Sequence, residues 1–222
     1  MHLSAMQFLI EHIAEEEIRG KRVLEVGSKY VNGSIRPFVE RFEPKEYVGV
    51  DIERGRYVDV VLPVERLRDC FKEESFDMII ATELLEHVRD RRMAVENIKT
   101  VLTVGGSLYI TTRSYGFPFH AYPHDFWRFE DADIKAIFPD FVSVKLMQDP
   151  ESPGVFFKGS KSRNKPANLS SVALYSMVMG KRTTLMPSIN DMPYARRMKV
   201  GFGKLMGQSY LLMRKSFNLL RR

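Results

Sequence analysis

The sequence predicts a doubly wound α/β fold, in which helices cover both faces of an open, mostly parallel sheet. Between residues 22 and 137, short apolar runs typical of buried strands alternate with helical patterns. The first run stops at Gly27 and the second at Asp51, as expected for strands that end at a ligand site. Near residue 150, two further runs face each other across a Pro-rich turn, which predicts an antiparallel hairpin at one edge of the sheet.

Each element follows from its local pattern. Apolar residues at helical spacing predict a leading helix within residues 1–20. Strands are predicted at 23–26, 47–51, 58–62, 76–81, 107–112, 142–147 and 154–159, and helices at 35–42, 65–71, 90–102 and 130–137. The resulting doubly wound sheet closes near Lys161, so we expect one domain over residues 1–161.

Residues 162–222 differ in composition from the rest. Residues 1–150 carry 20 Lys and Arg against 26 Asp and Glu, whereas residues 151–222 carry 14 against 2. The overall charge of +6 therefore describes neither part. After a linker, an apolar stretch at 169–179 and a basic one at 194–222 are both predicted to be helices. We expect 162–222 to be a basic, apolar-rich helical extension.

Composition excludes several classes of protein. A hydrophobic fraction of 44% with 28% charged residues excludes a disordered chain and a bundle of membrane spans. The single cysteine, Cys70, excludes an intramolecular disulfide and a multi-cysteine zinc site. No secretory signal and no run of 18 apolar residues is visible. We therefore expect a cytoplasmic protein.

A nucleoside site is predicted where the first two strands end. Gly27 lets a ligand approach the backbone, and Asp51 is placed to accept hydrogen bonds from the two hydroxyls of a ribose. Their separation, about two dozen residues, is what a strand, a helix and a strand require. This signal is shared by dehydrogenases and methyltransferases.

The following strands distinguish the two classes. Residues 76–88, FDMIIATELLEHV, and 101–110, VLTVGGSLYI, resemble the class I S-adenosylmethionine-dependent methyltransferases, as do VLEVG at 23–27 and YVGVD at 47–51. The resemblance implies a seven-stranded, Rossmann-like sheet, with S-adenosylmethionine as cofactor and S-adenosylhomocysteine as product. It also implies cofactor contacts: Glu25, Gly27 and Ser28 near the methionine part, Asp51 on the ribose, Ile52 on adenine, and Ala81, Thr82 and Glu83 on the methyl-donor side.

Two departures from the family pattern bear on the site. Gly27 is followed by Ser28, Lys29 and Tyr30 before the next glycine, and residues 61–64 lack the acid that the family often places beside adenine. Backbone groups would then hold adenine. The alternative to an active enzyme is a non-catalytic binding protein with a methyltransferase fold.

The acceptor side is predicted in the loop FPFHAYPHDFWRF at 117–129, which holds two of the five histidines and the only tryptophan. His120 or His124 could act as general base, with Asp125 orienting an imidazole or Arg128. Trp127 and Arg128 are interpreted as packing the loop. The segment resembles one found in methyltransferases that modify saccharides. The resemblance implies O-methylation of a saccharide or a lipid-linked glycan.

A metal site is the alternative. Glu83, Glu86 and His87 are spaced to share one face of a helical turn if the strand runs straight into a helix. With His120 or His124 they would suit Mg²⁺, Mn²⁺ or Zn²⁺. The spacing resembles the Glu-x-x-Glu-His element of metal-assisted O-methyltransferases, for which RNA or a quinone-like phenol is the acceptor. Methyltransferases without a metal often carry the same residues.

The tail at 195–222 carries eight basic residues and no acid. Three interpretations remain open. An interfacial helix would place the protein peripherally at the inner membrane surface, on anionic lipid. A basic patch would hold RNA phosphates, which the few interleaved aromatic residues disfavour. A third possibility is a helical extension packed on the acidic domain or in a homodimer.

Overall fold

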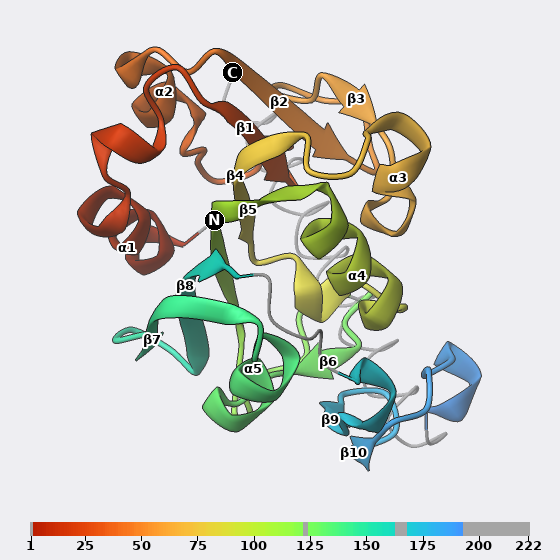
Figure 1. Ribbon diagram of the computed structural model, residues 1–222. Helices are drawn as coiled ribbons and strands as arrows, with labels where there is room; N and C mark the ends of the chain where they lie inside the picture. Colours follow the sequence, from red (N-terminus) through yellow and green to blue (C-terminus); the bar gives the residue numbers. More distant parts are fainter. Residues whose placement is uncertain (1, 122–123, 163–167, 193–222) are drawn as a thin grey trace, which may run out of the picture.

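In the computed structural model, which describes residues 2–121, 124–162 and 168–192, a seven-stranded sheet forms the centre of the molecule (Figure 1). Its strand order is β3-β2-β1-β4-β5-β8-β7. The first five strands are parallel, whereas β8 runs antiparallel to both β5 and β7. The strands are β1 (Arg22–Val26), β2 (Glu46–Asp51), β3 (Val60–Val61), β4 (Phe76–Thr82), β5 (Leu102–Arg113), β7 (Phe141–Gln148) and β8 (Gly154–Lys161). This sheet confirms the predicted fold class.

Helices pack on both faces of the sheet (Figure 1). They are α1 (Leu3–His12), α2 (Arg36–Val39), α3 (Leu67–Cys70), α4 (Arg91–Val101) and α5 (Asp131–Ile137). Successive side chains of a strand point to opposite faces of the sheet, so each strand contributes to the core layers on both faces. In β1, Val23 packs with α1 and α2, whereas Leu24 and Val26 pack with α3, α4 and α5. Side chains on both sides of β1 are thus removed from water.

Short 3₁₀ turns link several of these elements. They are η1 (Glu15–Glu17), η2 (Glu40–Phe42), η3 (Val64–Arg66), η4 (Leu85–His87), η5 (Leu169–Ser171) and η6 (Ile189–Asp191). The leading helix ends at His12, before the predicted end at Gly20, because Glu17 turns toward the sheet. Its carboxylate accepts hydrogen bonds from Tyr109 Oη at 2.7 Å and Lys158 Nζ at 2.8 Å.

The prediction of a helix over residues 169–179 is wrong. After η5, β9 (Leu174–Ser176) pairs with β6 (Trp127–Arg128) and β10 (Lys181–Thr183) in a three-stranded antiparallel sheet. The backbone of β6 pairs with this segment as a strand, which a helix could not do, and Leu174 is buried in the main core. Since this segment contacts the first domain, the division into 1–161 and 162–222 stays a prediction.

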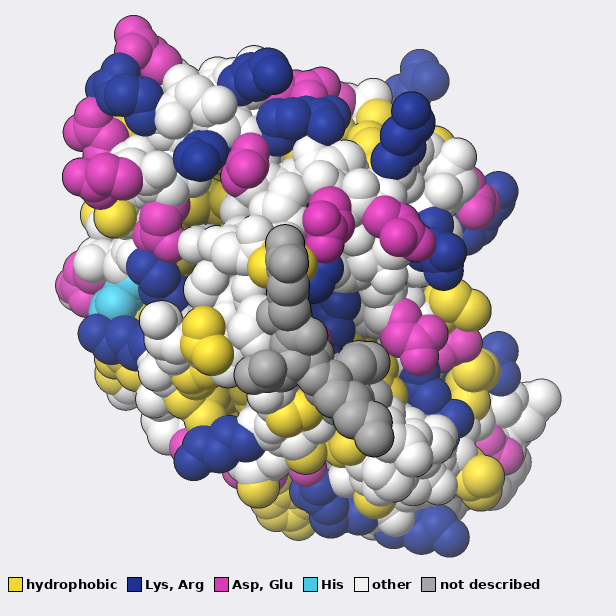
Figure 2. Space-filling view, viewed as in Figure 1, with side chains coloured by type: hydrophobic (Ala, Val, Ile, Leu, Met, Phe, Trp, Pro, Cys, Tyr) yellow, Lys and Arg dark blue, Asp and Glu magenta, His cyan; other side chains and the backbone are white. Residues whose placement is uncertain are grey.

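Charged side chains of both signs are interspersed on the face shown in Figure 2. No helix among residues 2–121, 124–162 and 168–192 is long and apolar enough to cross a membrane. The basic helix predicted at 194–222 lies outside the described residues. The lipid, RNA and homodimer interpretations of the tail therefore stay predictions.

Candidate active site

A cavity of about 330 Å³ opens at the carboxyl ends of β1 and β2. Of the predicted cofactor residues, Gly27, Asp51 and Ile52 line it, together with His87 and His124 from the acceptor side. Residues that sequence reasoning missed also line it: Leu62, Glu65, Leu84, Val88, Arg89 and Phe126. Glu65 supplies an acid one residue beyond the stretch 61–64, so a wider window would have found it.

Gly27 keeps the cavity open to the backbone of β1. Its φ of +82° lies in the left-handed region that favours glycine. Its N–H donates to Val50 O at 2.8 Å, which ties the turn to β2. A Cβ at this position would lie 3.3 Å from Leu84 Cδ1, inside the cavity wall. A side chain here would therefore both strain the turn and narrow the cavity.

Asp51 presents a fixed carboxylate at the end of β2. Its Oδ2 accepts the Lys29 N–H at 3.1 Å, and its Oδ1 accepts the Glu53 N–H at 3.0 Å. Each carboxylate oxygen has a second lone pair for a ligand hydroxyl. Ser28 Oγ is buried beside this turn without a hydrogen-bond partner. Asp51 is thus available for a ligand hydroxyl, which fits the predicted cofactor, whereas Ser28 is not among the lining residues of the cavity.

Glu25 lies beneath the cavity and is not among its lining residues. It is 2% exposed and accepts a hydrogen bond from Tyr47 Oη at 2.8 Å. Burial raises the pKa of Glu25 to about 7, because the desolvation outweighs this bond. Ala81 and Thr82 are also buried at the end of β4, away from the lining.

Glu25 should make stability depend on pH. Its pKa is near 4.5 in the unfolded chain and about 7 in the fold, so between these values the folded state binds more protons. The free energy of unfolding should therefore fall as pH rises from 4.5 to 7, by up to about 3 kcal/mol. Glu25→Gln, which keeps an acceptor for Tyr47, should flatten this slope in denaturant unfolding of the cofactor-free protein. An equally steep slope in the variant would contradict the assignment.

Glu83 does not join the predicted metal ligands. The expectation that Glu83, Glu86 and His87 share a helical face is wrong, because Glu83 has a φ of +52° that breaks the turn. Its carboxylate instead pairs with the buried Arg113, which also bonds Asp149 at 3.0 Å. Its N–H donates to Thr111 O at 2.8 Å. Glu83 is thereby directed toward β5.

His120 takes the place of Glu83 in the cluster. Ligand atoms of Glu86, His87 and His120 all lie within 4.8 Å of one another. The Nε2 atoms of the two histidines are 3.2 Å apart. Glu86 is fully buried, and its Oε1 has no hydrogen-bond partner, while Oε2 accepts from Thr112 Oγ1 at 2.9 Å. Burial, aided by the nearby charge of Glu83, raises the pKa of Glu86 to about 7.

Asp125 and Arg128 anchor the segment that carries His120 and His124, called the histidine loop below. Both side chains are fully buried, with Arg128 Nη1 2.6 Å from Asp125 Oδ1. Asp125 Oδ2 accepts the His120 N–H at 2.9 Å and lies 3.1 Å from His120 Nδ1. Burial opposes ionisation, but the bonds from Arg128 and His120 outweigh it and hold the pKa of Asp125 well below its usual range. The predicted packing role of Trp127 agrees with its bond from Nε1 to Val88 O at 3.1 Å.

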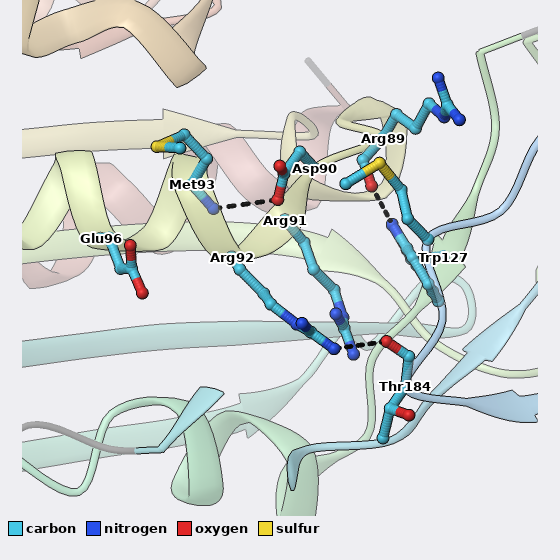
Figure 3. A pocket seen from close by; sticks show the side chains of 9 residues that line it. Arg89, Asp90, Arg91, Arg92, Met93, Glu96, Trp127 and Thr184 are labelled. Atoms are coloured by element: carbon cyan, nitrogen blue, oxygen red, sulfur yellow. Dashed lines mark hydrogen bonds between the residues drawn. The ribbon is translucent and has the colours of Figure 1, made fainter. Parts of the chain in front are cut away.

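A second cavity, of about 240 Å³, lies between the start of α4 and the segment around Thr184 (Figure 3). Arg91 and Arg92 line it, and Arg89 lines both this cavity and the first one. No sequence motif marked these arginines, because their convergence depends on where residues 168–192 pack.

Comparisons with known proteins define the class. Residues 24–110 match a family model described as a methyltransferase domain. No curated protein matches the chain significantly. Among solved structures, an Archaeoglobus fulgidus S-adenosylmethionine-dependent methyltransferase superposes with a TM-score of 0.57 at 14% identity, over 70% of this chain and 92% of that one.

Two further structures agree in fold. A Burkholderia thailandensis 1,6-didemethyltoxoflavin N1-methyltransferase with bound S-adenosylhomocysteine has a TM-score of 0.55 at 16% identity, over 72% of this chain and 77% of that one. A Thermotoga maritima S-adenosylmethionine-dependent methyltransferase has a TM-score of 0.53 at 18% identity, over 72% of this chain and 89% of that one. Residues 24–110 therefore carry a methyltransferase domain, and the chain shares the fold of S-adenosylmethionine-dependent methyltransferases. Both findings support S-adenosylmethionine as the cofactor.

Proposed function

We propose that this methyltransferase transfers the methyl group to a hydroxyl of a saccharide or a lipid-linked glycan. The observation that supports this proposal most is the His87–His120–Asp125 chain, of which His87 lines the cofactor cavity. A hydroxyl, unlike an amine, must lose its proton as it attacks the methyl group, so it needs a base in contact with it. His124, which also lines the cavity, is the second candidate base.

The hydrogen bonds assign protons to the two imidazoles. His87 Nδ1 is 2.6 Å from His124 O, a carbonyl that can only accept, so Nδ1 carries the proton. His120 Nδ1 faces the Asp125 carboxylate and is protonated for the same reason. In the neutral rings both Nε2 atoms therefore hold lone pairs, 3.2 Å apart. A proton bound to either Nε2 can form a hydrogen bond to the other, so the pair is arranged to take up the hydroxyl proton.

The division of roles follows from these positions. The bound cofactor supplies an activated methyl group. Asp51 and Gly27 hold the cofactor at the ends of β1 and β2, and the His87–His120 pair accepts the proton of the acceptor. Asp125 keeps His120 in the tautomer with a free Nε2. Arg128 in turn fixes Asp125.

Removing the base should abolish turnover without weakening cofactor binding. We expect His120→Ala to lower kcat for a hydroxyl acceptor about 10²–10⁴-fold, with the S-adenosylhomocysteine affinity unchanged. His124→Ala tests the second candidate, and His12→Ala, on α1, serves as control. The assay measures S-adenosylhomocysteine release and the mass and linkage of the methylated saccharide. Full turnover in both loop variants, or methylation of an amine with hydroxyls left intact, would refute the proposal.

A metal-assisted reaction is the second candidate, favoured by the same two lone pairs. Two ligand atoms of one cation lie roughly 3–3.5 Å apart when each bond is about 2.1 Å, close to the observed 3.2 Å. The unpartnered Oε1 of Glu86 adds a carboxylate ligand. Two imidazoles and one carboxylate suit Zn²⁺ or Mn²⁺ better than Mg²⁺. Such an ion would bind the acceptor hydroxyl and lower its pKa.

Metal content separates the two candidates. If the second holds, the purified enzyme should carry one equivalent of a divalent ion by mass spectrometry. A chelator should remove both the ion and the activity, and Zn²⁺ or Mn²⁺ should restore them. Glu86→Gln should lose the ion, whereas Glu96→Gln, an exposed glutamate of α4, should keep it. A metal-free enzyme whose kcat is unaffected by the chelator leaves only the base mechanism.

A further inference from the structure

Arg91 differs from the other buried arginines of residues 2–121, 124–162 and 168–192. Arg113 and Arg128 each bond a buried carboxylate, at 3.0 and 2.6 Å. Arg91 is also buried, at 5% exposure, yet within the described residues no carboxylate lies within 4.0 Å of its guanidinium. Its Nη2 donates to Val172 O, and its Cζ lies 4.5 Å from the centre of the Trp127 ring. A buried cation without a counter-ion is unfavourable.

Arg92 adds a second positive charge at the same place. The two side chains extend side by side from α4 toward Thr184 (Figure 3), and Arg92 Nη2 donates to Thr184 O at 2.5 Å. Burial, aided by the charge of Arg92, lowers the pKa of Arg91 to about 10. The nearby Asp90 carboxylate is engaged as the cap of α4, accepting from Met93 N at 3.1 Å. Glu96 is exposed on the cavity rim.

Both guanidinium groups border the 240 Å³ cavity and have donors to spare. A guanidinium carries five N–H donors, and toward the described residues each of these two uses only Nη2. The remaining donors form planar forks that match the oxygens of a phosphate or carboxylate. An anion in the cavity would supply the missing counter-charge to both arginines.

We propose that Arg91 and Arg92 form a subsite for an oxyanion, a phosphate or carboxylate group carried by the methyl acceptor. Anion binding stands on the geometry alone, whereas its assignment to the acceptor rests on the proposed function. Arg89 supports that assignment because it lines both this cavity and the cofactor cavity. A group held by Arg91 and Arg92 would therefore anchor a molecule whose other end reaches the cofactor.

Binding of inorganic pyrophosphate, phosphate and acetate to the full chain tests the subsite directly. Calorimetry at low ionic strength should show pyrophosphate or phosphate binding that weakens with salt. Arg92→Ala and Arg91→Lys should each weaken it at least about tenfold, since each charge-assisted bond is worth that much or more. Arg68→Ala, an exposed arginine of α3, should bind as the unaltered chain does. Unchanged S-adenosylhomocysteine affinity in all variants shows that they fold. No binding, or equal binding by every variant, overturns the subsite.

Kinetics with paired acceptors test whether the bound anion belongs to the methyl acceptor. Arg92→Ala should raise KM about tenfold for an acceptor bearing a phosphate or carboxylate, and leave KM unchanged for its neutral analogue. Equal effects on both acceptors would overturn the link to the acceptor and identify the ligand as a free anion. If no hydroxyl is methylated while pyrophosphate still binds, the proposed function fails and the subsite stands.

Discussion

Arg128→Met should destabilise the fold by about 3–5 kcal/mol, among the largest effects expected of a single substitution in this chain. The change leaves the Asp125 carboxylate buried from water without its arginine partner, and only His120 still bonds it. It also removes donors to Phe117 O and Pro118 O, at 3.2 and 2.9 Å, which hold the start of the histidine loop. Denaturant unfolding followed by circular dichroism measures the loss.

Arg66→Met provides a matched control. Arg66 and Asp69 have the same spacing as the buried pair and the same 2.6 Å separation, but their side chains are 65% and 50% exposed. The contribution of this exposed pair to the free energy of unfolding should be below about 1 kcal/mol. If the two substitutions destabilise the protein equally, burial is not what makes the Asp125–Arg128 pair important.

Asp51→Ala should weaken S-adenosylhomocysteine binding by about 10- to 100-fold or more. Each hydrogen bond from a ribose hydroxyl to this carboxylate contributes about 1.5–3 kcal/mol, and each 1.4 kcal/mol is a factor of ten. The substitution also removes the acceptors for the Lys29 and Glu53 N–H groups, which shape the cavity wall. Isothermal calorimetry on the purified chain gives the dissociation constant.

Asp51→Asn separates these two contributions. The amide oxygen keeps one acceptor for the backbone but lacks the negative charge, so its affinity should lie between those of Asp51→Ala and the unaltered chain. Asp59→Ala is the control on the same edge, because Asp59 bonds Arg36 and Gly49 and does not line the cavity. Unaltered affinity in Asp51→Ala would place the ribose elsewhere.

The sheet could be predicted because its signals are local. Apolar runs that end at Gly27 and Asp51 define β1 and β2, and the turn at Asp149–Pro153 defines the hairpin. Gly105 and Gly106 were expected to precede the next strand, but β5 begins at Leu102 and includes them. The pairing with β4 shifts register there, and Gly105 has a φ of +80°, so the glycines form an irregularity inside the strand.

The candidate site could be predicted only in part because its acceptor side depends on distant contacts. The i, i+3, i+4 spacing suggested that Glu83 would accompany Glu86 and His87, but the left-handed backbone at Glu83 turns it toward Arg113, thirty residues further along the chain. His120 reaches His87 instead, through bonds to Asp125. Periodicity in the sequence contains no information about such backbone reversals.

The strand order also sets when each half of the enzyme can form during synthesis. The strands of the cofactor half, β1 to β5, can all pair once about residue 113 has left the ribosome, because β1 to β4 pair only among themselves and with β5. The acceptor half must wait, since β8 is inserted between β5 and β7, and β6 has no strand partner before β9 at residue 174. The nascent chain would therefore be able to bind its cofactor before its histidine loop is locked in place. A stalled-ribosome series could time these two events separately.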